Sequence, residues 1–362
     1  LGGVTISLEV EPSIEYDNNI FATSDDPTED VSYNLRSQAV LSHQTGNFTA
    51  SLTGDVDLRR YFEETGQNAD AGGVEGTLVW SPRTEEVASI VASIDRVIED
   101  RGDPEARVNP DLGPRAVRVS SVEAGYRRAR GKLLFDFGAE ATEFDALSPL
   151  DDDRDFFVAG GIAKLGVRVA GQAFATASAF YSNRDFRLET SPQGVNRDAQ
   201  IYGGRLGVDF LPGGLFEGGF SVGVFRNEPE DPSIAPRTGL SLDGLLTFYP
   251  RRRMALIFEA SRGDVATFRG GAAGRTDTSA RVTWQHEIRH NLFSSLSLGY
   301  LESNFEESNI TQETVIARGE IEYLIGRNVS VLGNISFGDR DSDLALEEFD
   351  RRRGGISLRF RF

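Results

Sequence analysis

The sequence predicts an all-β fold: a closed antiparallel transmembrane β-barrel of about 18 strands in up-and-down order. Three observations predict it. Apolar and polar residues alternate along short segments, the connections between these segments are alternately short and long, and no segment approaches the ~18 consecutive apolar residues of a membrane-spanning helix. We expect a single barrel domain over residues 1–362, located in the outer membrane of a Gram-negative bacterium.

Alternation is clearest in the C-terminal segment. Ile356, Leu358, Phe360 and Phe362 fall on one face, and the residues between them are polar. The same pattern predicts strands near 8–22, 31–44, 48–62, 72–82, 86–99, 117–128, 132–146, 155–169, 172–188, 198–211, 215–227, 237–250, 253–266, 276–288, 292–305, 312–325, 328–340 and 350–362.

The connections between these strands differ in length and charge. Short turns such as Arg130-Gly131 and Arg251-Arg252 are basic, whereas long loops carry acidic runs such as Glu63-Glu64 and Glu306-Glu307. Tight periplasmic turns and longer outer loops are typical of outer-membrane barrels. The two ends of the barrel are therefore predicted to differ in the sign of their charge.

Composition excludes several other classes of protein. Hydrophobic residues make up 39% of the chain and the mean hydropathy is -0.31, as expected when only every second strand residue is apolar. The absence of cysteine excludes disulfides, thiolate nucleophiles and Cys-based metal sites. A net charge of -18 argues against nucleic acid as a partner. Because the chain starts at Leu1 without a leader, we expect a signal peptide to have been removed.

Any transport function must reside in the inward-facing polar residues. Their mixed charges suit either ion pairs that brace the wall or a hydrated track for a polar polymer, and the sequence favours neither. The predicted lumen-lining residues are Arg36, Asp55, Asp57, Arg59, Asp136, Glu140, Arg205, Asp209, Glu217, Arg281, Arg318, Glu320, Arg359 and Arg361.

Catalytic and metal sites are not predicted. The three histidines, His43, His286 and His290, all map to the short-turn end, away from where a barrel hydrolase would place its site. The run Asp151-Asp152-Asp153 could bind a divalent cation, but it lacks spaced ligands and is better explained as a solvated acidic loop. We expect no enzyme activity, no cofactor and no resident metal.

The opening segment 16–23, Tyr-Asp-Asn-Asn-Ile-Phe-Ala-Thr, resembles the N-terminal motif of the beta-barrel porin 2 family. Fainter similarities lie at 109–111, 125–126, 152–155 and 338–342, and in the final strand. The resemblance implies a barrel that works with a periplasmic polysaccharide-export partner, and it brings no catalytic motif. A terminal strand ending in Phe360 and Phe362 resembles the signal by which the outer-membrane assembly machinery selects its clients.

The resulting hypothesis is an outer-membrane conduit for a secreted polysaccharide, coupled to a periplasmic export protein that docks at the basic short-turn end. Two alternatives are a structural or assembly barrel within an envelope complex and a diffusion porin for small solutes. Outer-membrane lipid, lipopolysaccharide and the assembly machinery are the other expected partners.

Overall fold

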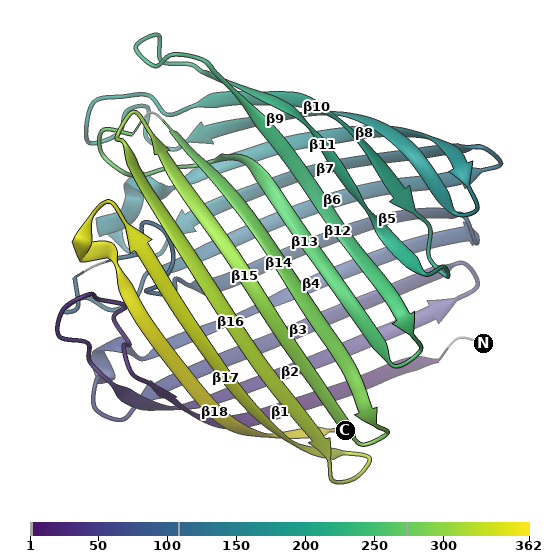
Figure 1. The fold of residues 1–362 in the computed structure, drawn as a ribbon, viewed down its shortest axis with the longest axis horizontal. Helices are drawn as coiled ribbons and strands as arrows, with labels where there is room; N and C mark the ends of the chain where they lie inside the picture. Colours follow the sequence, from purple (N-terminus) through teal and green to yellow (C-terminus); the bar gives the residue numbers. More distant parts are fainter. Residues whose placement is uncertain (1–2, 108, 273) are drawn as a thin grey trace.

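The computed structural model describes residues 3–107, 109–272 and 274–362. Each strand pairs antiparallel with the next along the chain, and the last pairs back with the first, from Glu9 opposite Arg361 to Asp17 opposite Arg353. The result is a closed meander of 18 strands (Figure 1). The predicted fold class and strand count are confirmed.

The strands, in chain order, are β1 (Val4–Asp17), β2 (Asp30–Thr45), β3 (Phe48–Tyr61), β4 (Ala69–Arg83), β5 (Glu86–Ile98), β6 (Ala116–Arg130), β7 (Leu133–Ala146), β8 (Phe156–Ala170), β9 (Ala173–Phe186), β10 (Ala199–Phe210), β11 (Phe216–Pro229), β12 (Arg237–Arg251), β13 (Met254–Val265), β14 (Gly274–Arg289), β15 (Leu292–Glu306), β16 (Ile310–Leu324), β17 (Val329–Ser342) and β18 (Phe349–Arg361). Three short 3-10 turns, η1 (Thr65–Gln67), η2 (Pro149–Arg154) and η3 (Ala345–Glu347), lie in the long connections. No helix among these described residues is long and apolar enough to cross a membrane.

Apolar side chains cover the outside of the cylinder rather than filling it. Ile6, Leu206 and Ile356 are all about two-thirds exposed or more, at 72%, 68% and 67%, and their chain neighbours point inward. In water this exposure would be costly, whereas hydrocarbon solvates such a band. The inner face is instead built from small polar and charged residues.

The first strand is shorter at its C-terminal end than predicted. We expected it to extend to residue 22, but β1 ends at Asp17 and a turn follows. Asn19 holds this turn: its side chain accepts from the Thr23 backbone N–H (3.1 Å) and donates to the carbonyls of Thr23 (2.8 Å) and Asp350 (3.0 Å). The distinctive opening segment is thus a strand end followed by an Asn-stapled turn that is tied to β18.

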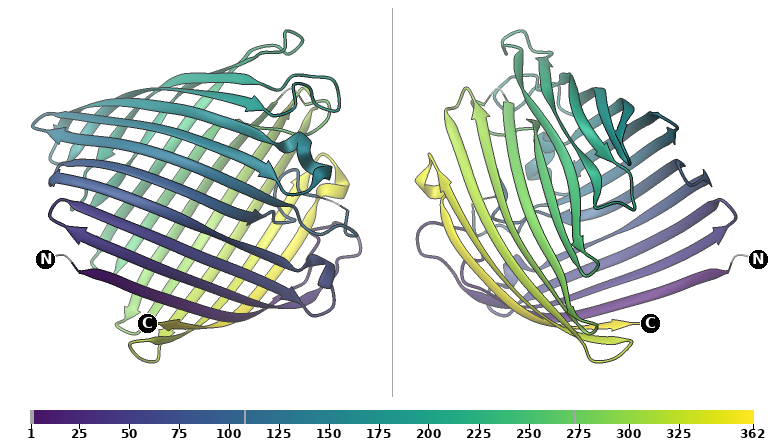
Figure 2. Two further views of the ribbon diagram at one scale, coloured as in Figure 1. Left: turned by 180° about the vertical axis from the view of Figure 1, so that it is seen from behind. Right: turned by 45° about the vertical axis from the view of Figure 1, so that its right-hand side comes forward.

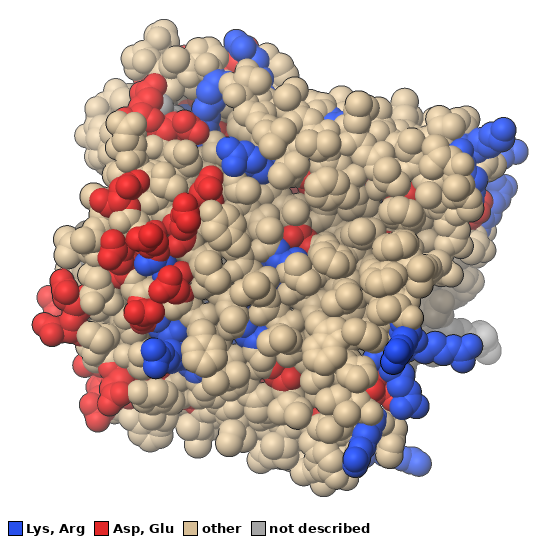
Figure 3. All heavy atoms as spheres, viewed as in Figure 1, with Lys and Arg blue, Asp and Glu red and all other residues tan. Residues whose placement is uncertain are grey.

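The two ends of the barrel differ as the sequence suggested. Both termini lie at the end with the short turns, and the long connections gather at the other end (Figures 1 and 2). Figure 3 shows acidic side chains concentrated at the long-loop end and basic side chains at the short-turn end. We call the long-loop end the outer end.

Candidate functional site

The predicted lumen residues lie on strands whose alternate side chains form the exposed apolar surface. Val56 on β3 and Ile321 on β16, for example, are 47% and 48% exposed on the outer face. The predicted residues lie on β2 (Arg36), β3 (Asp55, Asp57, Arg59), β7 (Asp136, Glu140), β10 (Arg205, Asp209), β11 (Glu217), β14 (Arg281), β16 (Arg318, Glu320) and β18 (Arg359, Arg361).

Ion pairs connect the inner faces of β16, β18 and β1. Arg359 contacts Glu11 at 2.6 Å and Glu9 at 3.2 Å, and Arg361 contacts Glu9 at 3.1 Å. Both arginines also reach Glu322 on β16, at 3.5 and 2.9 Å. These charges therefore brace the wall where the first and last strands meet.

Three further predicted residues belong to local ion pairs. Arg36 and Asp57 lie directly opposite each other on β2 and β3, with Nε and Oδ2 2.9 Å apart. Asp209 is only 5% exposed and contacts Lys164 on β8 at 3.1 Å. The β10 carboxylate is therefore largely neutralised by its neighbour.

Arginines of β10 and β14 are held more loosely. The Arg205 Nε donates to the Ser241 hydroxyl at 2.8 Å, and its guanidinium lies 4.3 Å from the centre of the Phe180 ring. Arg281 lies 3.8 Å from Glu259, and both side chains are about half exposed. Exposed pairs at such separations contribute little to stability.

Carboxylates on β3 to β7 form an acidic inner wall. Asp55 and Asp95 lie on either side of Gly73, and a Cβ at Gly73 would collide with the Asp95 side chain. Further along the wall, Glu123 lies directly opposite Glu140. None of these four carboxylates has a basic partner within 4 Å among the described residues. Two hollows of about 350 and 500 Å³ follow this wall.

The β5–β6 connection, described over residues 99–107 and 109–115, reaches into the outer mouth of the barrel, where it contacts β14 and β18, and we call it the plug segment. Asp100 accepts from Arg351 at 2.6 Å and from Arg353 at 2.9 Å, and Arg351 also contacts Asp17 at 2.7 Å. Burial alone would raise the pKa of Asp100, but the two guanidinium groups outweigh it and hold this pKa well below its usual range. This clasp joins the plug segment to the seam between β1 and β18.

The far side of the plug segment is anchored by Glu105. Its carboxylate accepts from the Thr267 hydroxyl (2.9 Å), the Phe268 backbone N–H (2.8 Å) and Arg275 on β14 (2.7 Å). β14 lies eight strands from β6 in a ring of 18, so this contact reaches nearly across the barrel. Glu105 has a left-handed φ of 61°, a conformation that a non-glycine residue keeps only when its contacts hold it.

The base of the plug segment is a buried ion network. Arg115 contacts Glu99 at 2.9 Å and Asp151 at 2.8 Å, and Arg107 contacts Asp151 at 2.5 Å. The Asp151 side chain is only 7% exposed, so our expectation of a solvated acidic loop is wrong at this residue. The arginines neutralise it, and among the described residues no cluster of His, Cys, Asp or Glu suited to a metal ion is found.

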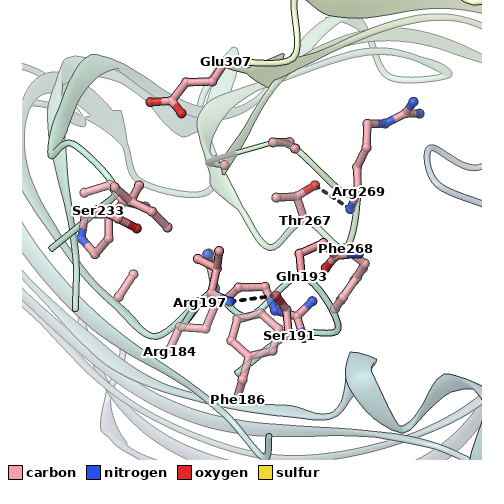
Figure 4. Close-up of a pocket in the computed structure, with 18 of the residues that line it drawn as sticks. Arg184, Phe186, Ser191, Gln193, Arg197, Ser233, Thr267, Phe268, Arg269 and Glu307 are labelled. Carbon is pink, nitrogen blue, oxygen red and sulfur yellow. Dashed lines mark hydrogen bonds between the residues drawn. The ribbon is translucent and has the colours of Figure 1, made fainter. Parts of the chain in front are cut away.

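A cavity of about 210 Å³ lies beside the plug segment at the outer mouth (Figure 4). The Arg197 guanidinium lies 4.2 Å from the centre of the Phe186 ring and near Phe268, and it donates to the carbonyl of Asp153. Arg184 is paired with Asp264 at 2.8 Å. The arginines of this cavity therefore serve mainly to dock the outer loops against the wall.

The three histidines and the terminal phenylalanines, which the sequence analysis also singled out, lie at the short-turn end of the barrel. His286 lines a hollow of about 380 Å³ at the short-turn mouth, and His43 and His290 lie beside or within short turns. Phe362 is 70% exposed and its backbone exchanges hydrogen bonds with Leu8 at 2.9 and 3.1 Å. The role of Phe360 and Phe362 as an assembly signal stays a prediction.

Sequence reasoning missed the residues that hold the plug segment. Arg351 and Arg353 share the inward parity of Arg359 and Arg361, so alternation along β18 could have found them. Arg340 on β17, which donates to plug carbonyls, is detectable in the same way. Glu105 lies in a loop without periodicity, and nothing in the pattern marks it.

The FrpB iron transporter from Neisseria meningitidis is similar in structure, with a TM-score of 0.50 and 10% identity over 99% of this chain and 82% of that chain. OpdK from Pseudomonas aeruginosa gives a TM-score of 0.49 and 12% identity over 99% of each chain. At these identities the similarity concerns the fold alone. None of the curated protein sequences matches the chain.

The family model described as "Putative beta-barrel porin 2" matches residues 1–362, so it covers every strand of the barrel as well as the plug segment. The family resemblance is confirmed by this match. The chain therefore belongs to the Putative beta-barrel porin 2 family, and it is a porin of the bacterial outer membrane.

Proposed function

We propose that this porin is a gated conduit for the export of a secreted polysaccharide, with the plug segment as its gate. One observation carries the proposal. The plug segment crosses the lumen, yet among the described residues its bonds to the strands are made through side chains or to single carbonyls, with no β-ladder. It can therefore leave the lumen without breaking the barrel wall.

The inner wall supports passage of a polar polymer. Below the plug segment, glycine, serine and carboxylate groups line the hollows on β3 to β8, and another hollow of about 380 Å³ lies at the short-turn mouth. Small polar groups leave room for water and offer weak, repeated hydrogen bonds, as conduction requires. A hydroxyl-rich chain would find partners along the whole path.

The short-turn end supports docking of a periplasmic export protein. Arg251, Arg252 and Arg253 are exposed at the β12–β13 turn, and Arg289 and Arg327 are exposed at two neighbouring turns. Such a basic rim favours a partner with an acidic surface and speeds their association at low salt. The family resemblance supports the same kind of partner.

The gate is tested by releasing it and by fixing it. Glu105→Ala removes the acceptor of three hydrogen bonds and should raise single-barrel conductance in a planar bilayer, whereas Glu63→Ala in an exposed outer loop should not. Because the chain has no cysteine, Glu105→Cys with Thr267→Cys can be joined by a cleavable bis-maleimide. The joined barrel should stay closed, and cells that carry it should lack surface polysaccharide. Cleavage of the cross-link should restore both conductance and surface polysaccharide.

Normal surface polysaccharide in cells that carry the joined barrel, or in cells lacking the gene, would refute export through this lumen. A diffusion porin for small solutes is the second candidate, because a segment that narrows the lumen at one level also suits size selection. It predicts uptake of small solutes by the wild type, without any effect of gene deletion on surface polysaccharide.

A further inference from the structure

Two arginines form a directly opposed pair on the outer face of the barrel. Arg96 on β5 lies opposite Arg118 on β6 in the antiparallel register. Their chain neighbours face the lumen, since Asp95 contacts Ser93 and Ser93 contacts Ser121 across the inner wall. Both guanidinium groups therefore point outward, and like charges directly opposite each other on a sheet destabilise it.

The carboxylates nearby neutralise only one member of this pair. Asp145 on β7 contacts Arg118 at 2.5 Å and Arg187 at 2.9 Å, and Arg187 also contacts Asp155 at 2.7 Å and Glu143 at 3.4 Å. Arg96 is exposed and has no carboxylate within 4 Å among the described residues. The pair consequently keeps one positive charge, that of Arg96, without a carboxylate partner, and an external anion can supply this partner.

The pair lies at the outer boundary of the apolar band. Ile94 (61% exposed) precedes Arg96 on the outer face of β5, and Val122 (51% exposed) follows Arg118 on that of β6. From Arg118 to Arg128, at the other end of β6, ten residues of a tilted strand span roughly 25 Å, the height of a barrel's lipid-facing band. The two guanidinium groups are thus level with the outer headgroup layer, where phosphate is the abundant anion.

The remote side of the barrel carries the opposite charge at the same level. Glu302, Glu313 and Asp341 lie in one row across β15, β16 and β17, each opposite the next. Figure 3 shows this acidic rim on the front strands. An anionic headgroup is repelled there, so the outer rim distinguishes two faces.

We propose that the Arg96–Arg118 pair binds a phosphate group of a lipid headgroup in the outer leaflet. Each guanidinium offers forked N–H donors that match phosphate oxygens, and a phosphate between them converts a repulsive pair into two charge-assisted contacts. The site is independent of conduction through the lumen.

Arg96→Gln is the most informative variant, because it leaves the Arg118–Asp145 pair in place. Binding of diphosphorylated lipid A to the purified barrel in phosphate-free buffer is measured by native mass spectrometry and by the shift in unfolding temperature. We expect affinity to fall about tenfold, as for one lost charge-assisted hydrogen bond, and further in Arg96→Gln/Arg118→Gln. Without lipid, the variants should be as stable as the wild type or more stable, because the like-charge pair is gone.

The matched control is Glu313→Gln/Asp341→Asn on the acidic rim, which should leave lipid A affinity unchanged. Lipid A stripped of its phosphates should bind the wild type no better than it binds the variants. Unchanged affinity in Arg96→Gln/Arg118→Gln, or equal binding of the stripped lipid, would overturn the proposal. Equal stabilisation by inorganic phosphate at the same concentration would overturn the assignment to a lipid.

Discussion

Two inner walls of this barrel carry charge in different ways. Where β18 meets β1, three inner carboxylates of β1 have arginine partners: Glu9 with Arg361, Glu11 with Arg359 and Asp17 with Arg351. On β3 to β7 the carboxylates of Glu123 and Glu140 face each other without such partners. The two walls have similar residue types but different pairing.

The backbone ladders of the two walls differ as well. The β6–β7 ladder is continuous over fourteen residue pairs, whereas the β1–β18 ladder lacks the pairs at Glu11 and Pro12. Leu8 exchanges both hydrogen bonds with Phe362, so by alternation residue 12 would donate to Leu358, and proline has no N–H. Side-chain ion pairs thus reinforce the wall whose ladder is interrupted, and the continuous wall leaves its charges available to permeant molecules.

Removing a partner from the paired wall should have the largest effect. Arg351→Ala removes the more buried of the two guanidinium groups shared by Asp17 (6% exposed side chain) and Asp100 and leaves them only Arg353, which we expect to cost about 3 kcal/mol. Urea unfolding followed by gel mobility measures it. Arg352→Ala, an exposed outward neighbour, is the control and should change stability by less than about 0.5 kcal/mol. Equal losses in both variants would contradict this distinction between the walls.

Acid should release the same clasp. The pKa of Asp100 is lowered by Arg351 and Arg353, so the stability it contributes is present above the unfolded-state pKa of about 3.9 and is lost as pH falls towards the folded value. We expect conductance to stay low from about pH 8 to about pH 4 and to rise only in stronger acid. Asp100→Asn should conduct at neutral pH. Opening of the wild type near neutral pH would show that Asp100 does not control the clasp.

Restoring the missing donor should strengthen the interrupted ladder. Pro12→Val supplies an N–H towards Leu358 on a lipid-facing, β-compatible position, and we expect a gain of about 0.5–1.5 kcal/mol. The same urea assay measures the gain. Pro12→Val should also reduce the loss of stability caused by Arg359→Ala when the two substitutions are combined. The new backbone hydrogen bond and the Arg359 ion pairs stabilise the same seam between β1 and β18. Strictly additive effects would argue against this compensation.

The unpaired wall should respond most weakly in stability but clearly in selectivity. Glu123→Gln with Glu140→Gln removes a like-charge contact, and we expect a gain of about 0.2–1 kcal/mol. In the conducting Glu105→Ala barrel, the pair of substitutions should also lower the preference for potassium over chloride, read as the reversal potential in a salt gradient. Asp25→Asn with Asp26→Asn, in an exposed outer loop, is the charge-matched control.

Alternation has a period that is fixed by the pleat, so it predicts from chain position alone that Arg359 and Glu140 lie on the inner face. Pairing could not be predicted, because it depends on how strand tilt brings Glu322 of β16 to Arg361 of β18. The plug segment was missed as well. Glu105 acts through contacts 162 and 170 residues away in the chain, and such contacts have no local signature.

The clasp on Asp100 has a consequence for the order of events during biogenesis. Its partners, Arg351 and Arg353, lie 251 and 253 residues later in the chain, on the final strand. The plug segment therefore cannot be secured until that strand has docked against β1. A barrel caught midway through membrane insertion would leave a leak, and completion of the last strand seals the cell surface and the cylinder in one step.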